Sequence, residues 1–318
     1  MDTPSRQRPG GAAEGSSTMN GRVEAPFGRR LCEVTRNVES GGYRIFSVVD
    51  SAGPEPAAGQ FYMLAAGTRW GSLEERPYLA RAFSVADAER QRSGVRLDFL
   101  VQAVGPGTER LAGLEAGESI WITGPLGQPF SPPGELQDLR RPQTSPPNIR
   151  PQTSPPNIAG AILVGGGIGI APLAIWRRRL LDRGIPARVL LGFRDREHTG
   201  GLALFDCSEI RLASEDGHRG HHGYVTDLLT VLLEGDDAGS AAVYACGPPA
   251  MLEAVRLLCA RRGVACELAM EAPMACGFGA CFGCAVPLAD GGYMRLCVDG
   301  PVVRGEQIAT ALVRGSGH

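Results

Sequence analysis

The chain has 318 residues, of which 43% are hydrophobic and 21% charged, as in globular proteins of about two domains and unlike disordered chains. The formal net charge of −2 argues against a protein that binds nucleic acid through overall attraction to phosphates. No apolar run reaches the roughly 20 residues that a membrane helix needs, and the first residues lack the apolar core of a signal peptide. The sequence therefore predicts a cytoplasmic protein with no membrane span and no nucleic-acid partner.

The N-terminal part of the chain predicts a small antiparallel β barrel. Residues 1–27 are rich in Gly, Ser and Arg and predict a disordered tail. Within residues 28–130, short alternating segments are divided by turn residues, the pattern of antiparallel strands in a sandwich or barrel. One short helix is expected at Gly107–Leu114. The six expected strands are Leu31–Arg36, Tyr43–Val49, Gln60–Ala65, Arg81–Ala86, Val95–Val101 and Ser119–Ile122.

A Pro-rich segment, residues 131–158, separates this region from the rest of the chain. It contains the nine residues RPQTSPPNI twice, at 141–149 and again at 150–158. Two copies are too few for a repeat fold, and their prolines disfavour both helix and sheet. We therefore expect a flexible linker, lengthened by a duplication, at a domain boundary.

Residues 159–268 predict a parallel α/β domain. Apolar strands such as AGAILVGG, ARVLLGF, AAVYACG and VACELAM alternate with helical segments such as IAPLAIWRRRLLDRG and PPAMLEAVRLLCARRG. Buried strands that alternate with helices are typical of a parallel sheet covered on its faces. The last segment, 269–318, is rich in Gly and Cys and has little periodicity.

Four of the nine cysteines lie close together in this last segment, with the spacing Cys276-x4-Cys281-x2-Cys284-x12-Cys297. Disulfides are not expected in a cytosolic chain of this size, whereas thiolates bind soft metals. Glycines between the cysteines allow sharp turns that direct backbone N–H groups at the sulfurs. The spacing is that of the plant-type [2Fe–2S] ligand set with a shorter final gap. Structural zinc is the alternative, although zinc sites usually combine two pairs of similar spacing.

Two strand-to-helix turns predict a dinucleotide site. In the first, Gly165–Gly169 follows a strand and opens a helix, so that backbone N–H groups approach a phosphate closely. In the second, Cys246, Gly247 and Pro248 follow a later strand, and the carboxyl ends of parallel strands share one edge. The alternatives are a tight turn without a ligand and, for Cys246, a buried core cysteine.

A third motif lies in the predicted barrel. Arg81-Ala-Phe-Ser84 occupies an expected strand, and Gly107 with Thr108 begins the expected helix. An arginine and a helix N-terminus suit a pyrophosphate, and Phe83 suits a neighbouring aromatic ring system. A structural arginine at a sheet edge explains Arg81 equally well.

In this order, the motifs resemble the ferredoxin–NADP reductase superfamily, in which an antiparallel flavin barrel precedes a nicotinamide domain. The E-x-x-M-A-C-G-x-G-A-C-x-G-C segment that begins at Glu271, and the later C-x-D-G-P-V, resemble the electron-transfer subunit of class 1B dihydroorotate dehydrogenase, the PyrK family. The resemblance spans roughly Arg29 to Val303 outside the repeat linker. It implies an FAD-binding Greek-key barrel (28–130), an NAD-binding parallel-sheet domain (159–268) and a small [2Fe–2S] loop region (269–318).

The resemblance also implies site residues, and none of them is a catalytic acid or base. We expect Glu271 to organise the cysteine loop, or else to be a surface carboxylate. The expected FAD contacts are Arg81, Ala82, Phe83, Ser84, Leu100, Val101, Gln102, Gly107 and Thr108. The expected NAD contacts are Gly165, Gly166, Gly167, Gly169, Cys246, Gly247 and Pro248, and the expected cluster ligands are Cys276, Cys281, Cys284 and Cys297.

The implied function is electron transfer in pyrimidine biosynthesis. Electrons from a partner subunit that oxidises dihydroorotate on FMN pass through [2Fe–2S] and FAD to NAD+, in a heterotetramer of two of each subunit. The alternatives are a reductase subunit of a hydrogenase or sulfur reductase, and a zinc-stapled binding module. Arg194 and Arg196 leave the choice between NAD and NADP open, because they either bind the 2′-phosphate of NADP or form a solvated pair on the surface. The resemblance favours NAD.

Overall fold

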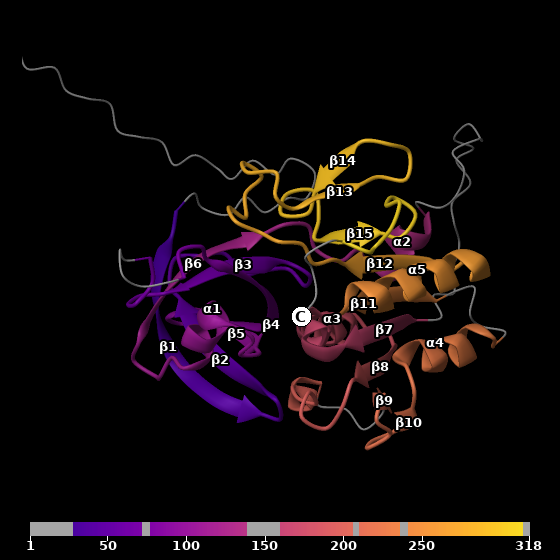
Figure 1. Ribbon diagram of the computed structural model, residues 1–318, viewed down its shortest axis with the longest axis horizontal. Coiled ribbons are helices and arrows are strands. Elements are labelled where there is room, and N and C mark those ends of the chain that lie inside the picture. The colour runs from indigo at the N-terminus through magenta and orange to yellow at the C-terminus, as the bar shows by residue number, and fades with distance from the viewer. Residues whose placement is uncertain (1–27, 72–76, 139–159, 206–209, 236–240, 314–318) are drawn as a thin grey trace, which may run out of the picture.

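The computed structural model describes residues 28–71, 77–138, 160–205, 210–235 and 241–313. The expected N-terminal tail and the duplicated nine-residue repeat lie outside these residues. The barrel forms one lobe, a parallel sheet with its helices forms the other, and the C-terminal segment lies along one side of both (Figure 1). No helix within the described ranges is long and apolar enough to cross a membrane.

The barrel consists of the six predicted antiparallel strands, closed in the order β1-β2-β5-β4-β3-β6. Inward-facing side chains such as Phe46, Tyr62, Leu97 and Phe99 are almost fully buried and fill its interior. The predicted helix is also present as α1 (Pro106–Ala112). The strands are β1 (Arg30–Ser40), β2 (Tyr43–Asp50), β3 (Phe61–Ala66), β4 (Arg81–Gln91), β5 (Gly94–Val101) and β6 (Ser119–Leu126).

The second lobe is a seven-stranded sheet with the order β10-β9-β8-β7-β11-β12-β15, parallel except at β15. Helix α3 packs on one face, and α4 and α5 pack on the other, which explains why β7, β11 and β12 are buried along their whole length. The predicted combination of a barrel with a parallel sheet is confirmed. The strands are β7 (Ala161–Gly166), β8 (Ala187–Phe193), β9 (Ile210–Ser214), β10 (His221–His222), β11 (Ala242–Cys246), β12 (Ala265–Ala269) and β15 (Val302–Arg304). The helices are η1 (Gly167–Ile170), α3 (Ala171–Asp182), η2 (Leu202–Leu204), α4 (Val225–Leu233) and α5 (Pro249–Arg262).

The C-terminal segment is tied to this sheet, although its sequence has little periodicity. Strand β15 pairs antiparallel with β12, with Glu267 opposite Arg304, and so covers an edge that would expose unpaired backbone groups. The rest of the segment forms the cysteine loop and a small hairpin of β13 (Ala285–Pro287) and β14 (Tyr293–Arg295). The cysteine loop is therefore anchored at both of its ends.

Part of the expected linker also packs as secondary structure. Residues Pro133–Asp138 form the short helix α2, whose first position suits proline because that residue's missing N–H would have no intrahelical partner. The Ser131 N–H donates to Oε2 of Glu267 (2.8 Å), and the Tyr244 hydroxyl donates to the Ser131 carbonyl (2.7 Å). Residues 131–138 thus differ from the flexible linker that their prolines predict.

Glu267 makes the fold sensitive to pH. It is only 4% exposed, and burial raises its pKa from 4.5 to about 7 even though Ser131 and Arg304 favour the ionised form. Between these two values the folded state holds a proton on Glu267 that the unfolded chain releases. The contribution of Glu267 to the free energy of unfolding is therefore greatest below about pH 4.5 and is lost as the pH rises to about 7.

We expect Glu267→Gln to abolish this loss, because glutamine keeps an acceptor for the Ser131 N–H without a charge. At pH 8 the variant should exceed the native protein in free energy of unfolding by about 1–3 kcal/mol, measured by urea titration, and the difference should vanish at pH 4.5. Glu33→Gln, which removes an exposed carboxylate from strand β1 of the barrel, is the control. Parallel pH profiles for the native protein and Glu267→Gln would contradict this account.

Direct contacts fix the angle between the lobes. Arg178 of α3 forms an ion pair with Asp87 of β4 (2.5 Å) and donates to the Ala88 carbonyl (2.5 Å). At the tip of the β1–β2 hairpin, the Tyr43 hydroxyl donates to the His198 carbonyl (2.6 Å), and the Gly42 N–H donates to the Thr199 carbonyl (3.0 Å). These contacts hold the barrel over the carboxyl edge of the parallel sheet.

Candidate functional site

Two cavities adjoin one another between the lobes. The barrel-side cavity, of about 430 Å³, lies against β4, β5 and α1, and the sheet-side cavity, of about 480 Å³, lies along the carboxyl edge of the sheet. They share a wall, because four residues line both of them: Gln102, Ile168, Gly169 and Glu271. Groups bound in the two cavities would therefore meet at this wall.

The barrel-side cavity brings together most of the predicted flavin residues. Arg81 lies against Gly107 so closely that a Cβ on the glycine would stand 2.8 Å from the arginine Nε. The Arg81 Nη1 donates to the Leu79 carbonyl (2.7 Å), which holds the guanidinium in place. The predicted residues in its lining are Arg81, Ala82, Phe83, Ser84, Leu100, Gln102, Gly107 and Thr108.

Two predicted residues do not line either cavity. Val101 is fully buried, and the alternation of side chains along a strand turns it away from the face on which Leu100 and Gln102 reach the cavity. Gly165 lies inside β7, where a Cβ would meet Ile170 and Leu191 at 2.9 Å. Gly165 therefore serves helix–sheet packing, which is one role of glycines in such turns.

The sheet-side cavity is built from the two predicted strand-to-helix turns. A Cβ on Gly169 would stand 2.6 Å from the Gly247 Cα, so the two turns touch backbone to backbone and glycine is required there. The predicted residues in this lining are Gly166, Gly167, Gly169, Gly247 and Pro248. Cys246 differs from the expectation, because it lines the barrel-side cavity instead.

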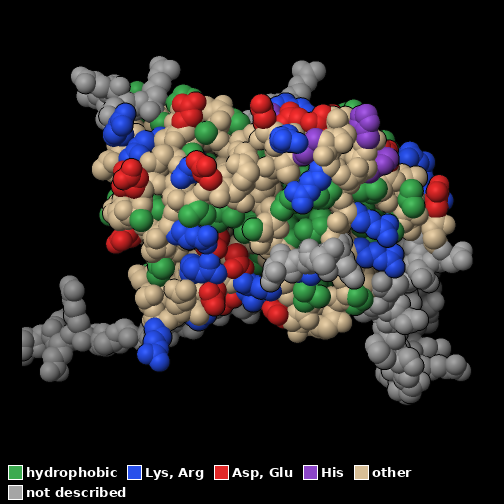
Figure 2. Space-filling model, turned by 90° about the horizontal axis from the view of Figure 1, so that it is seen from below, with side chains coloured by type: hydrophobic (Ala, Val, Ile, Leu, Met, Phe, Trp, Pro, Cys, Tyr) green, Lys and Arg blue, Asp and Glu red, His purple; other side chains and the backbone are tan. Residues whose placement is uncertain are grey.

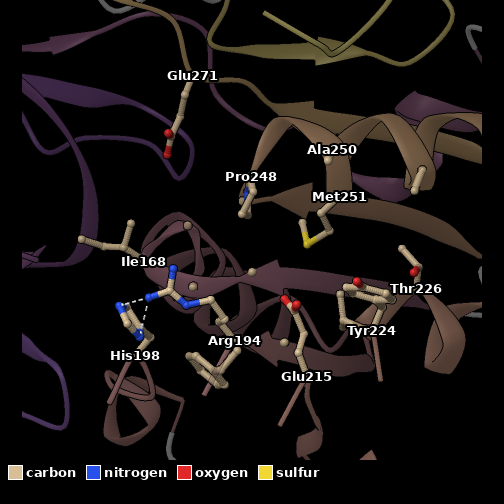
Figure 3. Close-up of a pocket in the computed structure, with 18 of the residues that line it drawn as sticks. Ile168, Arg194, His198, Glu215, Tyr224, Thr226, Pro248, Ala250, Met251 and Glu271 are labelled. Carbon is tan, nitrogen blue, oxygen red and sulfur yellow. Dashed lines mark hydrogen bonds between the residues drawn. The ribbon is translucent and has the colours of Figure 1, made fainter. Parts of the chain in front are cut away.

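Sequence reasoning missed part of the sheet-side cavity. Glu215 and Tyr224 line it beyond Arg194, and their side chains lie on the same side of the cavity in Figure 3. Glu215 directly follows β9, a strand that the sequence pattern did not reveal, so the position had no recognisable signal. Of the two arginines considered for a 2′-phosphate, Arg194 lines the cavity, whereas Arg196 does not.

Arg194 is engaged by its neighbours. Its Nε donates to Asp195 (3.1 Å), and its Nη2 hydrogen-bonds to the His198 ring (Figure 3). The His198 Nδ1 lies 2.6 Å from the Asp195 carboxylate, so a neutral ring that donates from Nδ1 accepts from Arg194 at Nε2. The hydrogen bond from His198, followed by the one from Arg194, holds the pKa of Asp195 well below its usual range.

Other histidines near the sheet-side cavity pair with carboxylates. On the face shown in Figure 2 they gather at one corner, and basic and acidic side chains alternate over the rest of that face. His218 contacts Asp216 (2.7 Å), and His221 contacts Asp227 (3.0 Å). Within the described ranges, no three His, Cys, Asp or Glu side chains are grouped so as to hold a single metal ion.

The cysteine loop packs against the barrel beside the barrel-side cavity. A Cβ on Gly277 would stand 2.6 Å from the Met63 side chain of β3, and Met274, two residues before Cys276, lines the cavity. Arg295 of β14 donates to the Gly279 carbonyl (3.0 Å) and stacks over the Phe282 ring (5.1 Å). Arg295 thus holds the loop, although no motif in the sequence singled it out.

The four cysteines offer thiolate donors, two of them buried and in contact and two toward the open side of the loop. Cys284 and Cys297 are buried with their sulfurs 3.2 Å apart, Cys276 is partly exposed, and Cys281 is exposed. Burial opposes ionisation of Cys276, but N–H groups of Phe278, Cys281 and Ala280 outweigh it and lower its pKa to about 6. Burial, and then the neighbouring Cys284 sulfur, raise the pKa of Cys297 to about 12. If Cys284 and Cys297 are both thiolates at 3.2 Å, they therefore need a cation between them.

Comparison with known proteins identifies the family. The profile for the iron–sulfur cluster binding domain of dihydroorotate dehydrogenase B matches residues 271–309, which include all four cysteines. Proteins named dihydroorotate dehydrogenase B (NAD(+)), electron transfer subunit, are similar over 80% of this chain. The one from Caldanaerobacter subterraneus subsp. tengcongensis is 30% identical over 88% of its own length, and the one from Clostridium acetobutylicum is 34% identical over 87%.

Solved structures agree on the fold. The NADH-dependent reduced ferredoxin-NADP oxidoreductase superposes with a TM-score of 0.68 and 24% identity, covering 89% of this chain and 91% of its own. A ferredoxin NADP+ reductase from Neisseria gonorrhoeae, solved with FAD and NADP, gives 0.55 and 16% over 74% of this chain and 92% of its own. The architecture agrees with these structures and the sequence with the curated relatives: the chain belongs to the family of electron transfer subunits of dihydroorotate dehydrogenase B.

Proposed function

We propose that this protein carries electrons from an FMN-containing dihydroorotate dehydrogenase subunit to NAD+, using a [2Fe–2S] cluster and FAD. The observation that carries this proposal is the sequence of sites in space: cysteine loop, barrel-side cavity, sheet-side cavity. Met274 lines the barrel-side cavity only two residues from Cys276, and the two cavities share a wall. When bound, the cluster supplies single-electron transfer, and the flavin converts single electrons into hydride equivalents.

Each site has residues suited to its group. Cys276, Cys281, Cys284 and Cys297 hold the cluster through thiolate sulfur, the ligand that iron–sulfur centres use. Arg81 binds the FAD pyrophosphate beside the backbone of Gly107, which carries no side chain that would push the phosphates away. The paired turns at Gly167–Gly169 and Gly247–Pro248 let the NAD+ backbone approach the sheet edge.

The chain's own residues favour NAD over NADP. Arg194, the cation best placed for a 2′-phosphate, already contacts Asp195 and His198. Glu215 lines the same cavity and places a carboxylate there, which suits ribose hydroxyls and repels an added phosphate.

The catalytic partner, in a heterotetramer of two of each subunit, belongs to the same proposal. Phe278 and Phe282 of the cysteine loop are 55% and 63% exposed, which supports a protein surface near the cluster. We place the complex in the cytoplasm, where a reducing environment suits the free cysteines found in the described residues.

The test is anaerobic purification followed by flavin, iron and sulfide analysis, absorption and electron paramagnetic resonance spectra, and addition of NADH. We expect stoichiometric FAD, two irons per chain, and rapid bleaching of the flavin by NADH but slow bleaching by NADPH. Without the partner, the protein should reduce dyes with NADH but should not oxidise dihydroorotate. A flavin that stays oxidised with NADH in excess, or a colourless protein loaded with zinc, would overturn the proposal.

A further inference from the structure

Glu271 stands where the two cavities meet. It lies two residues after the end of β12, and its side chain extends toward the shared wall, on the other side of the sheet-side cavity from Glu215 (Figure 3). Among the four residues that line both cavities, it alone has an ionisable side chain, since the others are Gln102, Ile168 and Gly169. Its carboxylate is therefore the one ionisable group that the two linings share.

Each of the other charged groups lines only one of the two cavities. Arg81, the remaining charged residue of the barrel-side lining, is held against Gly107. Arg194, His198 and Glu215 line only the sheet-side cavity. Cys246 is near the junction but uncharged, because burial, followed by the Glu271 carboxylate, raises its pKa well above the usual value.

The two redox forms of a nicotinamide differ in charge at the ring that must reach this junction. The ring of NAD+ carries one positive charge, and the ring of NADH carries none, whereas the remainder of the dinucleotide is the same in both. A glutamate carboxylate is negative at neutral pH. Its Coulomb attraction at close range, in a site partly shielded from water, acts on the oxidised ring and not on the reduced one.

We propose that Glu271 is a specificity-determining residue that favours the oxidised, positively charged nicotinamide over the reduced one at the junction of the two cavities. This inference rests on the proposed function, since it assumes that NAD+ is the acceptor. When the ring accepts a hydride it loses its positive charge and with it the attraction to Glu271. Glu271 thus strengthens binding of the oxidised electron acceptor, and this attraction no longer holds the ring once it is reduced.

The test compares three dinucleotides on the oxidised FAD- and cluster-loaded protein. NAD+ carries the charged ring; 1,4,5,6-tetrahydro-NAD, an unreactive analogue, carries an uncharged ring; ADP-ribose carries none. In Glu271→Gln, we expect NAD+ to bind about tenfold more weakly, whereas the analogue and ADP-ribose stay within about twofold of the native protein. Dissociation constants come from calorimetry, and an unchanged flavin spectrum and melting temperature show that the variant is folded.

The matched control is Glu215→Gln, which removes the same charge from the part of the sheet-side cavity that the barrel-side cavity does not share. The three dissociation constants should change by the same factor, because the three ligands are identical in the part that Glu215 faces. If Glu271→Gln changes all three affinities by one factor, or none of them, the inference is wrong and Glu271 only organises the cysteine loop. That result would leave the proposed function intact, provided that NADH still bleaches the flavin of the native protein.

Discussion

Replacing Cys297 with serine should remove iron and sulfide from the protein while leaving FAD in place. Cys297 lies buried 3.2 Å from Cys284, at the closed side of the loop, so its sulfur faces a second ligand rather than water. Serine offers a hard oxygen that ionises far less readily and binds iron poorly. Electron transfer from dihydroorotate to NAD+ through the assembled complex should then fall by at least about 100-fold.

Reduction of a dye by NADH separates loss of the cluster from loss of the fold. That reaction needs only the two cavities, so its rate in Cys297→Ser should stay within about twofold of the native rate. Cys259→Ala, which alters a fully buried cysteine of α5 outside the motif, should retain iron and coupled activity. A Cys297→Ser protein with full iron content and coupled activity would remove this residue from the ligand set.

The second large effect is expected for Arg81→Ala, which should weaken FAD binding by about 10- to 100-fold. The guanidinium lies against the Gly107 backbone at the wall of the barrel-side cavity and is held by the Leu79 carbonyl. Its charge-assisted hydrogen bonds to a pyrophosphate are replaced by water in the variant. FAD dissociation, followed by flavin fluorescence after dilution, measures the loss.

Two further variants make this result specific. Arg81→Lys keeps the charge but not the planar fork of donors, so its FAD affinity should lie between those of the native protein and Arg81→Ala. Arg90→Ala removes an exposed arginine from the opposite end of the same strand and should retain FAD fully. Equal FAD affinities for Arg81→Ala and Arg90→Ala would mean that Arg81 is a structural residue of the sheet edge.

The sequence alone determined the elements and the chemistry of the separate motifs. Alternation with period two marks barrel strands such as β6, and mainly apolar runs mark β7, β8, β11 and β12, because local burial leaves a direct trace in residue order. The cysteine spacing indicates its ligand chemistry for the same reason, since all four residues lie within one short segment. Strands β10 and β15 are too short to leave such a trace, and β9 contains an arginine and ends in a serine, which interrupt its apolar pattern.

Only the tertiary structure decided how the motifs face one another. Glu215, Arg295 and Glu271 acquire their places from the packing of segments distant in sequence, and no local pattern records which cavity a side chain will line. The same holds for Cys246, which lines the barrel-side cavity, and for Val101, which strand alternation directs into the core. The shared wall between the cavities exists because the barrel docks on the sheet edge through long-range contacts, and such contacts depend on the whole fold.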